Sequence, residues 1–242
     1  MNVETARLES AGKVDRRGRD RKAALLVAGF GALAMALLGA IAVWPGLDIA
    51  VARALRVGDP AARWVETARR LAYPAPYALA GAVVLYWIAR HARGRAPFPR
   101  RCALVVGLAL ALGPGLVVNA GLKNHVPRTR PLHTSEVAGA AAPFRPFTAL
   151  AGSCERNCSF PSGETAAAFA TLAPALAAPA PVPAAVAALA FGAGVGALRM
   201  AAGAHFLSDV AASAALMCFM VLALRRLLLA RPAHLRERGA RP

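Results

Sequence analysis

Apolar residues form long runs along this chain, and most polar residues lie between the runs. The first run, Ala23–Val43, contains 21 residues, and further apolar runs cover residues 74–89, 102–122, 163–177, 184–198 and 206–229. A helix needs about 20 predominantly apolar residues to cross the hydrocarbon core of a bilayer. The pattern therefore predicts six transmembrane helices. Because the first run is too long for the core of a cleaved signal peptide, we expect an uncleaved first helix.

Two segments depart from this regular alternation. Residues 163–177 are rich in alanine and only weakly apolar, so we expect them to pack inside the bundle with little surface toward lipid. Residues 47–72 alternate apolar positions with arginines and fit one or two amphipathic helices on the membrane surface, broken near residues 58–60; a solvated connecting loop fits them equally well. The predicted fold is an all-α integral membrane protein, a bundle of six transmembrane helices with an amphipathic outer-face segment between helices 1 and 2.

Composition agrees with a membrane protein. The chain is 57% hydrophobic with a mean hydropathy of +0.47, and 17% of its residues are charged, whereas soluble domains carry about 25% charged residues. Its formal net charge is +17. No basic helix is interleaved with base-stacking aromatic residues, so we interpret the cations as topology signals and contacts to anionic lipids, and we expect no nucleic-acid partner.

The cations are unevenly distributed between the predicted loops. Of the 29 Lys and Arg residues, 18 lie in segments 1–22, 90–101 and 225–242, and 11 lie in the segments that alternate with these. Because loops rich in Lys and Arg remain in the cytoplasm, both termini are expected to be cytoplasmic. The chain then divides into a basic cytoplasmic tail (1–22), a six-helix membrane domain (23–229) and a second basic cytoplasmic tail (230–242).

A cationic motif begins the long polar loop that follows the third predicted span. It reads Lys123-Asn-His-Val-Pro-Arg128-Thr-Arg130-Pro131 and includes one of only three lysines in the chain. An ammonium and a guanidinium group held together suit a phosphate. Taken alone, the motif is also compatible with an ordinary basic loop beside the membrane.

The fourth predicted span starts with Ser162-Gly163-Glu164. A serine before a helix is a good N-cap, and the free N–H groups of the first turn, approached closely over Gly163, form a cradle for an anion. A plain N-cap explains the same residues. Glu164 is either an acid that favours the helix dipole or a carboxyl group that acts as acid or base beside the site.

Arg199, His205 and Asp209 join the fifth predicted span to the sixth. Ionisable groups at the end of an apolar segment are costly unless they have partners and a function. His205 and Asp209 are four residues apart, which places them one turn apart on one face of a helix. The predicted topology puts these residues on the same outer face as Lys123 and Ser162, so the motifs form one candidate site for a phosphate.

The four cysteines fall into two kinds. Cys154 and Cys158 lie four residues apart in the polar loop, where a disulfide is expected if the loop faces an oxidising compartment; two free thiols are the alternative. Cys102 and Cys218 lie in or beside apolar runs and are interpreted as small buried hydrophobic residues. No His or further Cys stands at ligand spacing near the polar pair, so no metal site is predicted.

In order and spacing, the motifs resemble the three-part signature of the type-two phosphatidic acid phosphatase superfamily. The resemblance spans residues 123–209 and rests on Lys123, Arg130-Pro131, Pro161-Ser162-Gly163, Arg199, His205 and Asp209. It implies that His205 is a nucleophile that forms a phosphohistidine, and that Asp209 orients it. It also implies a set of phosphate-binding residues: Lys123, Arg130, Ser162, Gly163 and Arg199.

Two positions depart from the family pattern. Leu198 stands where serine is usual, and Glu164 stands where the family has a histidine that helps to protonate the leaving group. A carboxylic acid can supply that proton if its surroundings keep it protonated, whereas an ionised carboxylate would repel the phosphate. The sequence from Cys158 to Glu164 is similar to a subset of the family that resembles lipid A phosphatases.

The resemblance implies a metal-independent phosphoric monoester hydrolase without a cofactor. It would remove phosphate from a lipid headgroup of the lipid A, phospholipid or prenyl (pyro)phosphate class, at the periplasmic face of the bacterial inner membrane. Its partners would be the lipid substrate and the bilayer, with no obligate protein partner. A lipid phosphotransferase with the same site is an alternative function, as is a non-catalytic lipid-phosphate binder or transporter.

Overall fold

The computed structural model describes residues 3–58, 61–94, 100–149, 152, 154–178 and 180–229, without the side chains of residues 3–14, 100 and 124. These residues form helices joined by loops, with one isolated β-bridge between Thr134 and Ala142. The longer helices are α1 (Val3–Val43), α2 (Gly46–Leu55), α3 (Ala61–Ala72), α4 (Ala75–Ala92), α5 (Arg100–Leu110), the π-helix η1 (Ala111–Leu122), α10 (Pro181–Ala201) and α11 (Leu207–Leu229). The short helices are α6 (Lys123–His125), the 3₁₀ helix η2 (Pro131–His133), α7 (Ser135–Ala138), α8 (Gly163–Phe169) and α9 (Leu172–Ala175). The expected all-α fold is therefore confirmed for the described residues.

Five helical segments of the described chain are long and apolar enough to cross a membrane. They cover residues 15–43, 61–92, 101–122, 181–201 and 207–229. The expected fourth span, 163–177, forms α8 and α9, two helices of 7 and 4 residues separated by a turn. Pro174 lacks an N–H group and the Thr171 hydroxyl donates to the Ala168 carbonyl at 2.6 Å, so this segment does not continue as one helix.

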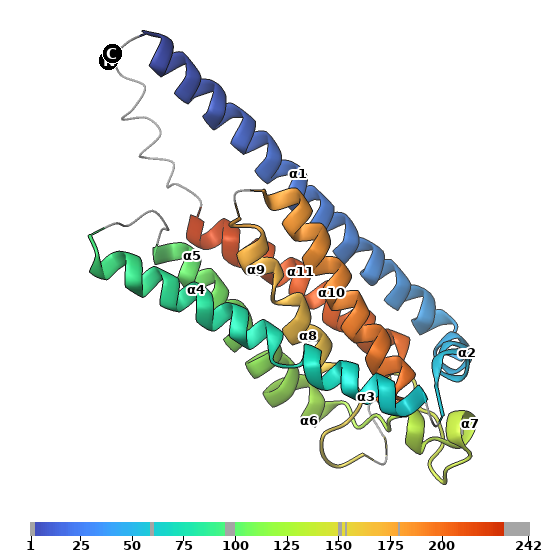
Figure 1. Cartoon of the computed structure of the whole chain (residues 1–242). Coiled ribbons are helices and arrows are strands. Elements are labelled where there is room, and N and C mark those ends of the chain that lie inside the picture. Colours follow the sequence, from blue (N-terminus) through green and yellow to red (C-terminus); the bar gives the residue numbers. More distant parts are fainter. Residues whose placement is uncertain are drawn as a thin grey trace.

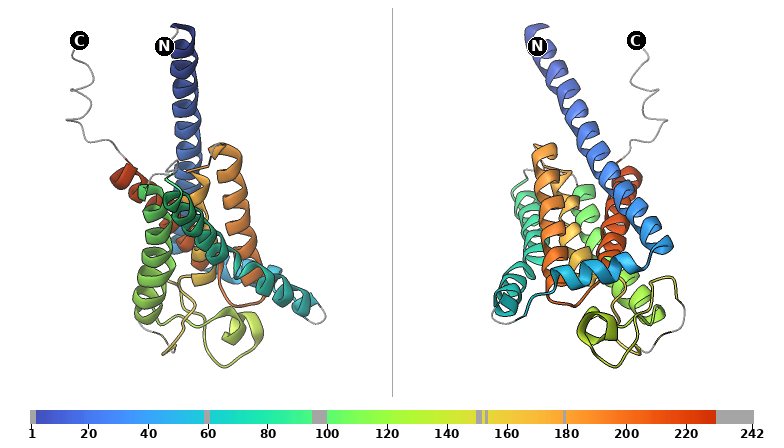
Figure 2. Two further views of the ribbon diagram at one scale, coloured as in Figure 1. Left: turned by 60° about the vertical axis from the view of Figure 1, so that its left-hand side comes forward. Right: turned by 90° about the vertical axis from the view of Figure 1, so that its right-hand side faces the viewer.

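The α8–α9 segment nevertheless packs inside the bundle, as its weak hydropathy predicted. Residues Thr165–Phe169 are buried, and α8 contacts α10, α11, η1 and α4 (Figure 2). Small residues allow this close packing. A Cβ atom at Gly192 would lie 2.4 Å from the Phe169 ring, so only glycine fits at that crossing of α10 over α8.

The chain between α1 and α4, which was predicted to be amphipathic, forms two helices, α2 and α3. The break lies between Leu55 and Ala61, as expected, although residues 59–60 are outside the described residues. On α3, the side chains of Trp64 and Leu71 are exposed. These apolar groups on a basic helix are typical of a surface that lies against lipid headgroups.

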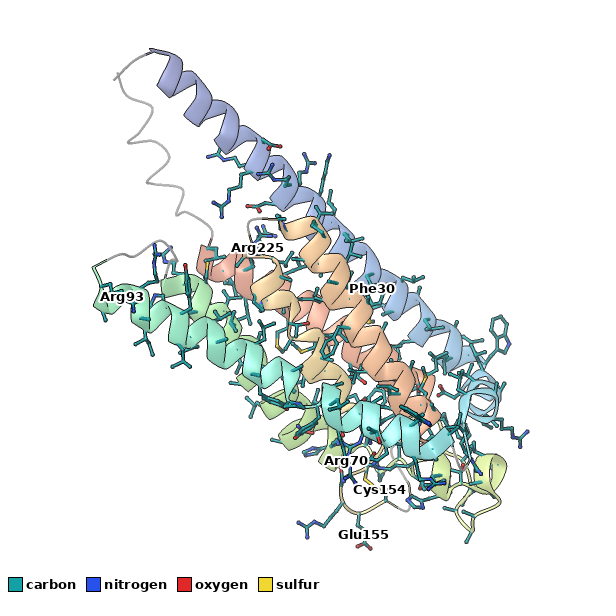
Figure 3. The ribbon with its side chains drawn as sticks, in the orientation of Figure 1. Phe30, Arg70, Arg93, Cys154, Glu155 and Arg225 are labelled. Carbon is teal, nitrogen blue, oxygen red and sulfur yellow. A yellow bond between two sulfur atoms is a disulfide. The ribbon has the colours of Figure 1, made fainter. Side chains whose placement is uncertain are left out.

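The two ends of the bundle carry different elements. Helices α2, α3, α6 and α7 gather at one end, and α1 begins at the other (Figure 1). Cys154 and Glu155 lie at the end with the short helices, whereas Arg93 and Arg225 lie at the opposite end (Figure 3). Residues 3–22 of the expected N-terminal tail are helical and continue into α1, while the expected tail 230–242 lies outside the described residues.

Candidate functional site

The predicted site residues converge at the end of the bundle that carries the short helices. Burial and the positive charges of Arg130 and Arg199 lower the pKa of the Lys123 ammonium group, and the carboxylates of Glu164 and Asp209 partly oppose this effect. Charges shift a pKa in this way when they lie close to the titrating group, and burial strengthens the interaction. Three cations and two acids from distant parts of the sequence therefore share one electrostatic environment.

His205 is buried, with 1% of its surface exposed. Its Nδ1 atom lies 2.8 Å from the Ser159 carbonyl oxygen and 3.5 Å from Asp209 Oδ2. Both neighbours are acceptors, so the ring hydrogen belongs on Nδ1 and the lone pair on Nε2. Burial lowers the pKa of His205, although the Asp209 carboxylate opposes this. These contacts hold the imidazole in one orientation with the lone pair on Nε2, a form that can act as a nucleophile or a base.

Asp209 is fully buried in the first turn of α11 and accepts several hydrogen bonds. Its donors are Ser159 Oγ at 2.5 Å, the Phe206 N–H at 2.7 Å and Arg128 Nη1 at 2.5 Å. The nearest partner of the His205 ring is thus the Ser159 carbonyl, and Asp209 fixes the Ser159 side chain beside it. Sequence reasoning gave Ser159 no role, because backbone carbonyl contacts leave no signal in residue types.

Arg128 occupies the centre of a buried ionic cluster behind the histidine. Its guanidinium group donates to Asp48 Oδ2 at 2.7 Å and to Asp209 Oδ1 at 2.5 Å. It also lies 4.2 Å from the centroid of the Phe206 ring. Asp48 in turn accepts hydrogen bonds from the Ser208 N–H at 2.9 Å and the Ser208 hydroxyl at 2.6 Å. The cluster fastens α2 to the start of α11.

The two signature cations of the long loop meet at a neutral partner, Asn157. Lys123 Nζ donates to Asn157 Oδ1 at 3.1 Å, and Arg130 Nη2 donates to the same oxygen at 3.0 Å and to the Asn157 carbonyl at 3.2 Å. Asn157 has φ of 52°, a left-handed conformation that asparagine tolerates better than most residues. Burial lowers the pKa of the Arg130 guanidinium group. Two partly desolvated cations therefore point at one oxygen atom.

The loop that carries Asn157 is closed by a disulfide between Cys154 and Cys158. This is the pairing that the sequence predicted. Cys158 is buried, and the Ser159 N–H donates to the Arg128 carbonyl at 2.8 Å, so the loop is attached directly to the histidine support. Cys102 is partly buried and Cys218 is buried, and both are free thiols.

Ser162 and Gly163 form the start of α8, as predicted. The Ser162 hydroxyl lies 2.7 Å from the Thr165 hydroxyl, and the Ser162 side chain is buried. A Cβ atom at residue 163 would lie 2.7 Å from Asn119 Oδ1, so Gly163 lets the Asn119 side chain of η1 approach the start of α8 closely. The pair thus sets the entry of α8 into the site.

Glu164 lies between two arginines. Arg69 Nη1 of α3 donates to Glu164 Oε1 at 3.1 Å, and Arg199 Nε of α10 lies 3.7 Å from Glu164 Oε2. This geometry describes an ion-paired carboxylate and departs from the apolar setting that a resident proton donor requires. Arg69 was not among the predicted site residues, because α3 gave only an amphipathic pattern.

Among the residues that the structure describes, no group of three or more His, Cys, Asp and Glu side chains is placed to hold a metal ion.

Comparison with known proteins identifies the relatives of this chain. The profile of the PAP2 superfamily matches residues 102–232. The lipid A 4'-phosphatase of Rhizobium leguminosarum is 32% identical over 207 residues, which cover 72% of this chain and 84% of that protein. The lipid A 4'-phosphatase of Rhizobium etli is 37% identical over 149 residues, covering 59% of this chain and 57% of that protein. The lipid A 4'-phosphatase of Francisella tularensis subsp. novicida is 37% identical over 114 residues, which cover 46% of this chain and 51% of that protein. No solved structure matches the chain.

Proposed function

Because the chain belongs to the PAP2 superfamily, we propose that it is a membrane lipid phosphatase, which removes a phosphate group from a lipid headgroup through a phosphohistidine. The observation that carries the proposal is the geometry around the buried His205: its Nδ1 atom lies 2.8 Å from the Ser159 carbonyl oxygen, next to the disulfide-closed loop on which Lys123 and Arg130 meet at Asn157. Cations of this kind stabilise the charge that develops on the transferring phosphoryl oxygens. The names of the relatives favour a phosphorylated lipid A as substrate.

In the first step, Nε2 of His205 attacks phosphorus, an N–P bond forms, and the bond from phosphorus to the lipid oxygen breaks. The hydrogen bond from Nδ1 to the Ser159 carbonyl holds the ring in the required tautomer. Lys123, Arg130 and Arg199 bind the phosphoryl oxygens, with Ser162 and Gly163 at the start of α8. The departing lipid oxygen takes up a proton.

In the second step, water attacks phosphorus, the N–P bond breaks, and inorganic phosphate leaves with His205 restored. Glu164 is the carboxyl group at the place where the family supplies its leaving-group proton. As an ion-paired carboxylate, Glu164 can take a proton from the attacking water in the second step and pass it to solvent, while the departing lipid oxygen takes its proton from solvent in the first step, so protons balance over a turnover.

The site is proposed to face the periplasm from the bacterial inner membrane, with both chain termini in the cytoplasm. The positive-inside distribution of Lys and Arg supports this orientation. The lipid tails would remain in the bilayer while the headgroup reaches the cations at the end of the bundle.

The test is phosphate release from a panel of lipid A, phosphatidic acid, phosphatidylglycerol phosphate and prenyl pyrophosphate by the purified protein in detergent. We expect release from at least one lipid, and a loss of at least about a thousandfold in His205→Ala. His91→Ala in α4 is the matched control, because His91 is an exposed histidine whose ring stacks on Trp87 at a centroid distance of 5.5 Å. Release from none of the lipids, or full activity in His205→Ala, would refute the proposal.

A phosphohistidine also has its own chemical signature. Brief reaction with a lipid labelled at phosphorus, followed by denaturation, should leave label on the wild-type protein that is stable in base and lost in acid. Protein carrying His205→Ala should retain no such label, and label of the opposite stability would point to a different nucleophile.

A further inference from the structure

Helix α3 lies outside residues 102–232, the part of the chain that the PAP2 profile matches, yet it reaches the site through one side chain. The Arg69 guanidinium group donates to both carboxylate oxygens of Glu66, through Nε and Nη2, each at 2.7 Å. Its remaining nitrogen, Nη1, donates to Glu164 at 3.1 Å. Arg69 is therefore held in a two-pronged clamp on its own helix and directed at α8.

Glu164 is shared unequally between two cations. Arg69 makes the hydrogen bond, whereas Arg199 Nε stands 3.7 Å from the second carboxylate oxygen, beyond hydrogen-bond distance. In the described residues, this Glu164 oxygen and Arg199 Nε are both buried without a hydrogen-bond partner. Arg69 is thus the nearer of the two cations to Glu164, and the Nε atom of Arg199 keeps its hydrogen for another acceptor.

A carboxylate beside a phosphate-binding site, such as that of Glu164, weakens the binding of phosphate. The substrate phosphate is an anion, and an unneutralised carboxylate beside it would repel it and would also attract the site cations away from it. The carboxylate of Glu164 acts on the charges of Lys123 and Arg130 as well as Arg199. Arg69 is not one of the proposed phosphate-binding residues, and its positive charge offsets the negative charge of Glu164.

We propose that Arg69 is a positioning residue that acts through Glu164: it neutralises this carboxylate, so that phosphate binds and Arg199 remains directed at it. The inference rests on the phosphatase function proposed above. When phosphate binds, it competes with Glu164 for the guanidinium groups that surround this carboxylate. The Glu66 clamp keeps Arg69 in reach during this exchange.

The experiment is a double-mutant cycle read out by inorganic phosphate, measured as its inhibition constant on a water-soluble phosphate monoester and as direct binding to the detergent-solubilised full-length protein. We expect Arg69→Gln to weaken phosphate binding by about tenfold. In a Glu164→Gln background, the same Arg69→Gln change should alter binding less than about twofold. An equal loss in both backgrounds, or no loss in either, would overturn the proposal.

Two further variants separate positioning from folding. Arg70→Gln is the matched control, because Arg70 is the neighbouring arginine on α3, its side chain is exposed, and it also pairs with Glu66, at 2.9 Å. It should bind phosphate as the wild type does, and a tenfold loss there would make the effect one of general charge on α3. Arg69→Lys keeps the charge without the fork geometry and should recover most of the lost binding. No recovery in Arg69→Lys would overturn the electrostatic explanation.

The kinetic parameters complete the test and keep the two proposals apart. On a lipid substrate, Arg69→Gln should raise KM more than it lowers kcat, and its pH–rate profile should change relative to that of Arg70→Gln. If the wild type releases phosphate from no lipid, the proposed function fails. If the wild type is active and Arg69→Gln behaves as Arg70→Gln does, only the role of Arg69 is overturned.

Discussion

Asp48 offers a sharp test of how His205, the proposed nucleophile, is supported, because Asp48 belongs to α2 and lies outside the residues that carry the signature. It is fully buried. Its carboxylate accepts a hydrogen bond from Arg128 Nη2 at 2.7 Å and two hydrogen bonds from Ser208, the residue before Asp209. Replacing Asp48 by alanine removes two acceptor oxygens, the three hydrogen bonds that they accept and one charge, and it leaves the proposed nucleophile unchanged.

The expected cost follows from the partners that remain. Breaking a buried ion pair by truncating one member destabilises a protein by about 3–5 kcal/mol, since the other charge stays buried. Arg128 retains Asp209 at 2.5 Å, which places Asp48→Ala toward the lower end of that range, about 3 kcal/mol. Asp48→Asn keeps an acceptor for the Ser208 N–H group and loses only the charge-assisted part of the contacts, about 1–2 kcal/mol.

The assay is denaturant unfolding in detergent, followed by phosphate release from the preferred lipid at a temperature where each variant remains folded. We expect stability to fall from wild type to Asp48→Asn to Asp48→Ala, and kcat to fall in the same order because the support of Asp209 loosens. Asp15→Ala is the control, since its carboxylate is 64% exposed in an ion pair with Arg19, and exposed pairs contribute little. Equal stability of Asp48→Ala and Asp15→Ala would refute the reasoning.

Three further predictions concern the histidine, the helix packing and the loop. Burial lowers the pKa of His205 from the ordinary histidine value of 6.5. The proposed nucleophile should therefore stay neutral at pH values somewhat below 6.5, and kcat/KM should decline with falling pH only below 6.5. A decline of kcat/KM centred above pH 6.5 would contradict this prediction. Gly192→Ala should destabilise the protein by about 1–3 kcal/mol in unfolding measurements, because its new Cβ would lie 2.4 Å from an aromatic ring of α8; Gly194→Ala, which meets nothing within 4 Å, should be neutral or slightly stabilising. Cys154 and Cys158 should resist thiol labelling until a reductant is added, and equal labelling before and after reduction would exclude the disulfide.

Hydrophobic pattern alone predicted most of the helices, and the reason it failed at one span is physical. Five of the predicted spans correspond to helical segments long and apolar enough to cross a bilayer. Alanine makes up 7 of the 15 residues of segment 163–177, and its small apolar side chain fits a protein interior as well as a lipid environment. Its division into α8 and α9 depends on local features, Thr171 and Pro174, that average hydropathy does not register. Packing inside the bundle was predictable because weak hydropathy is poorly matched to lipid.

The sequence was sufficient to propose the signature residues, because their chemistry and spacing repeat a known order, but it did not indicate the residues that support them. The contact between Arg128 and Asp48 joins residues 80 apart in the sequence, and that between Arg69 and Glu164 joins residues 95 apart. Hydrophobic periodicity indicates which face of a helix is buried, and it contains no information on which distant polar residue meets that face. A buried acid on an amphipathic helix, such as Asp48, looks in sequence like a solvated one.

The hydrogen-bond partners of Arg128 and Arg130 explain why we propose different roles for these two arginines of one short motif. Arg128 is 1% exposed and forms ion pairs with the carboxylates of Asp48 and Asp209. These two carboxylates neutralise its charge, and the ion pair with Asp209 joins the loop to α11. Arg130 and Lys123 instead share the amide oxygen of Asn157, a neutral acceptor. A phosphate oxygen carries more negative charge than an amide oxygen and can therefore replace it at both cations with a gain in interaction energy. The cation that is neutralised builds the site, and the cations that are left with a neutral partner are the ones available to bind the substrate.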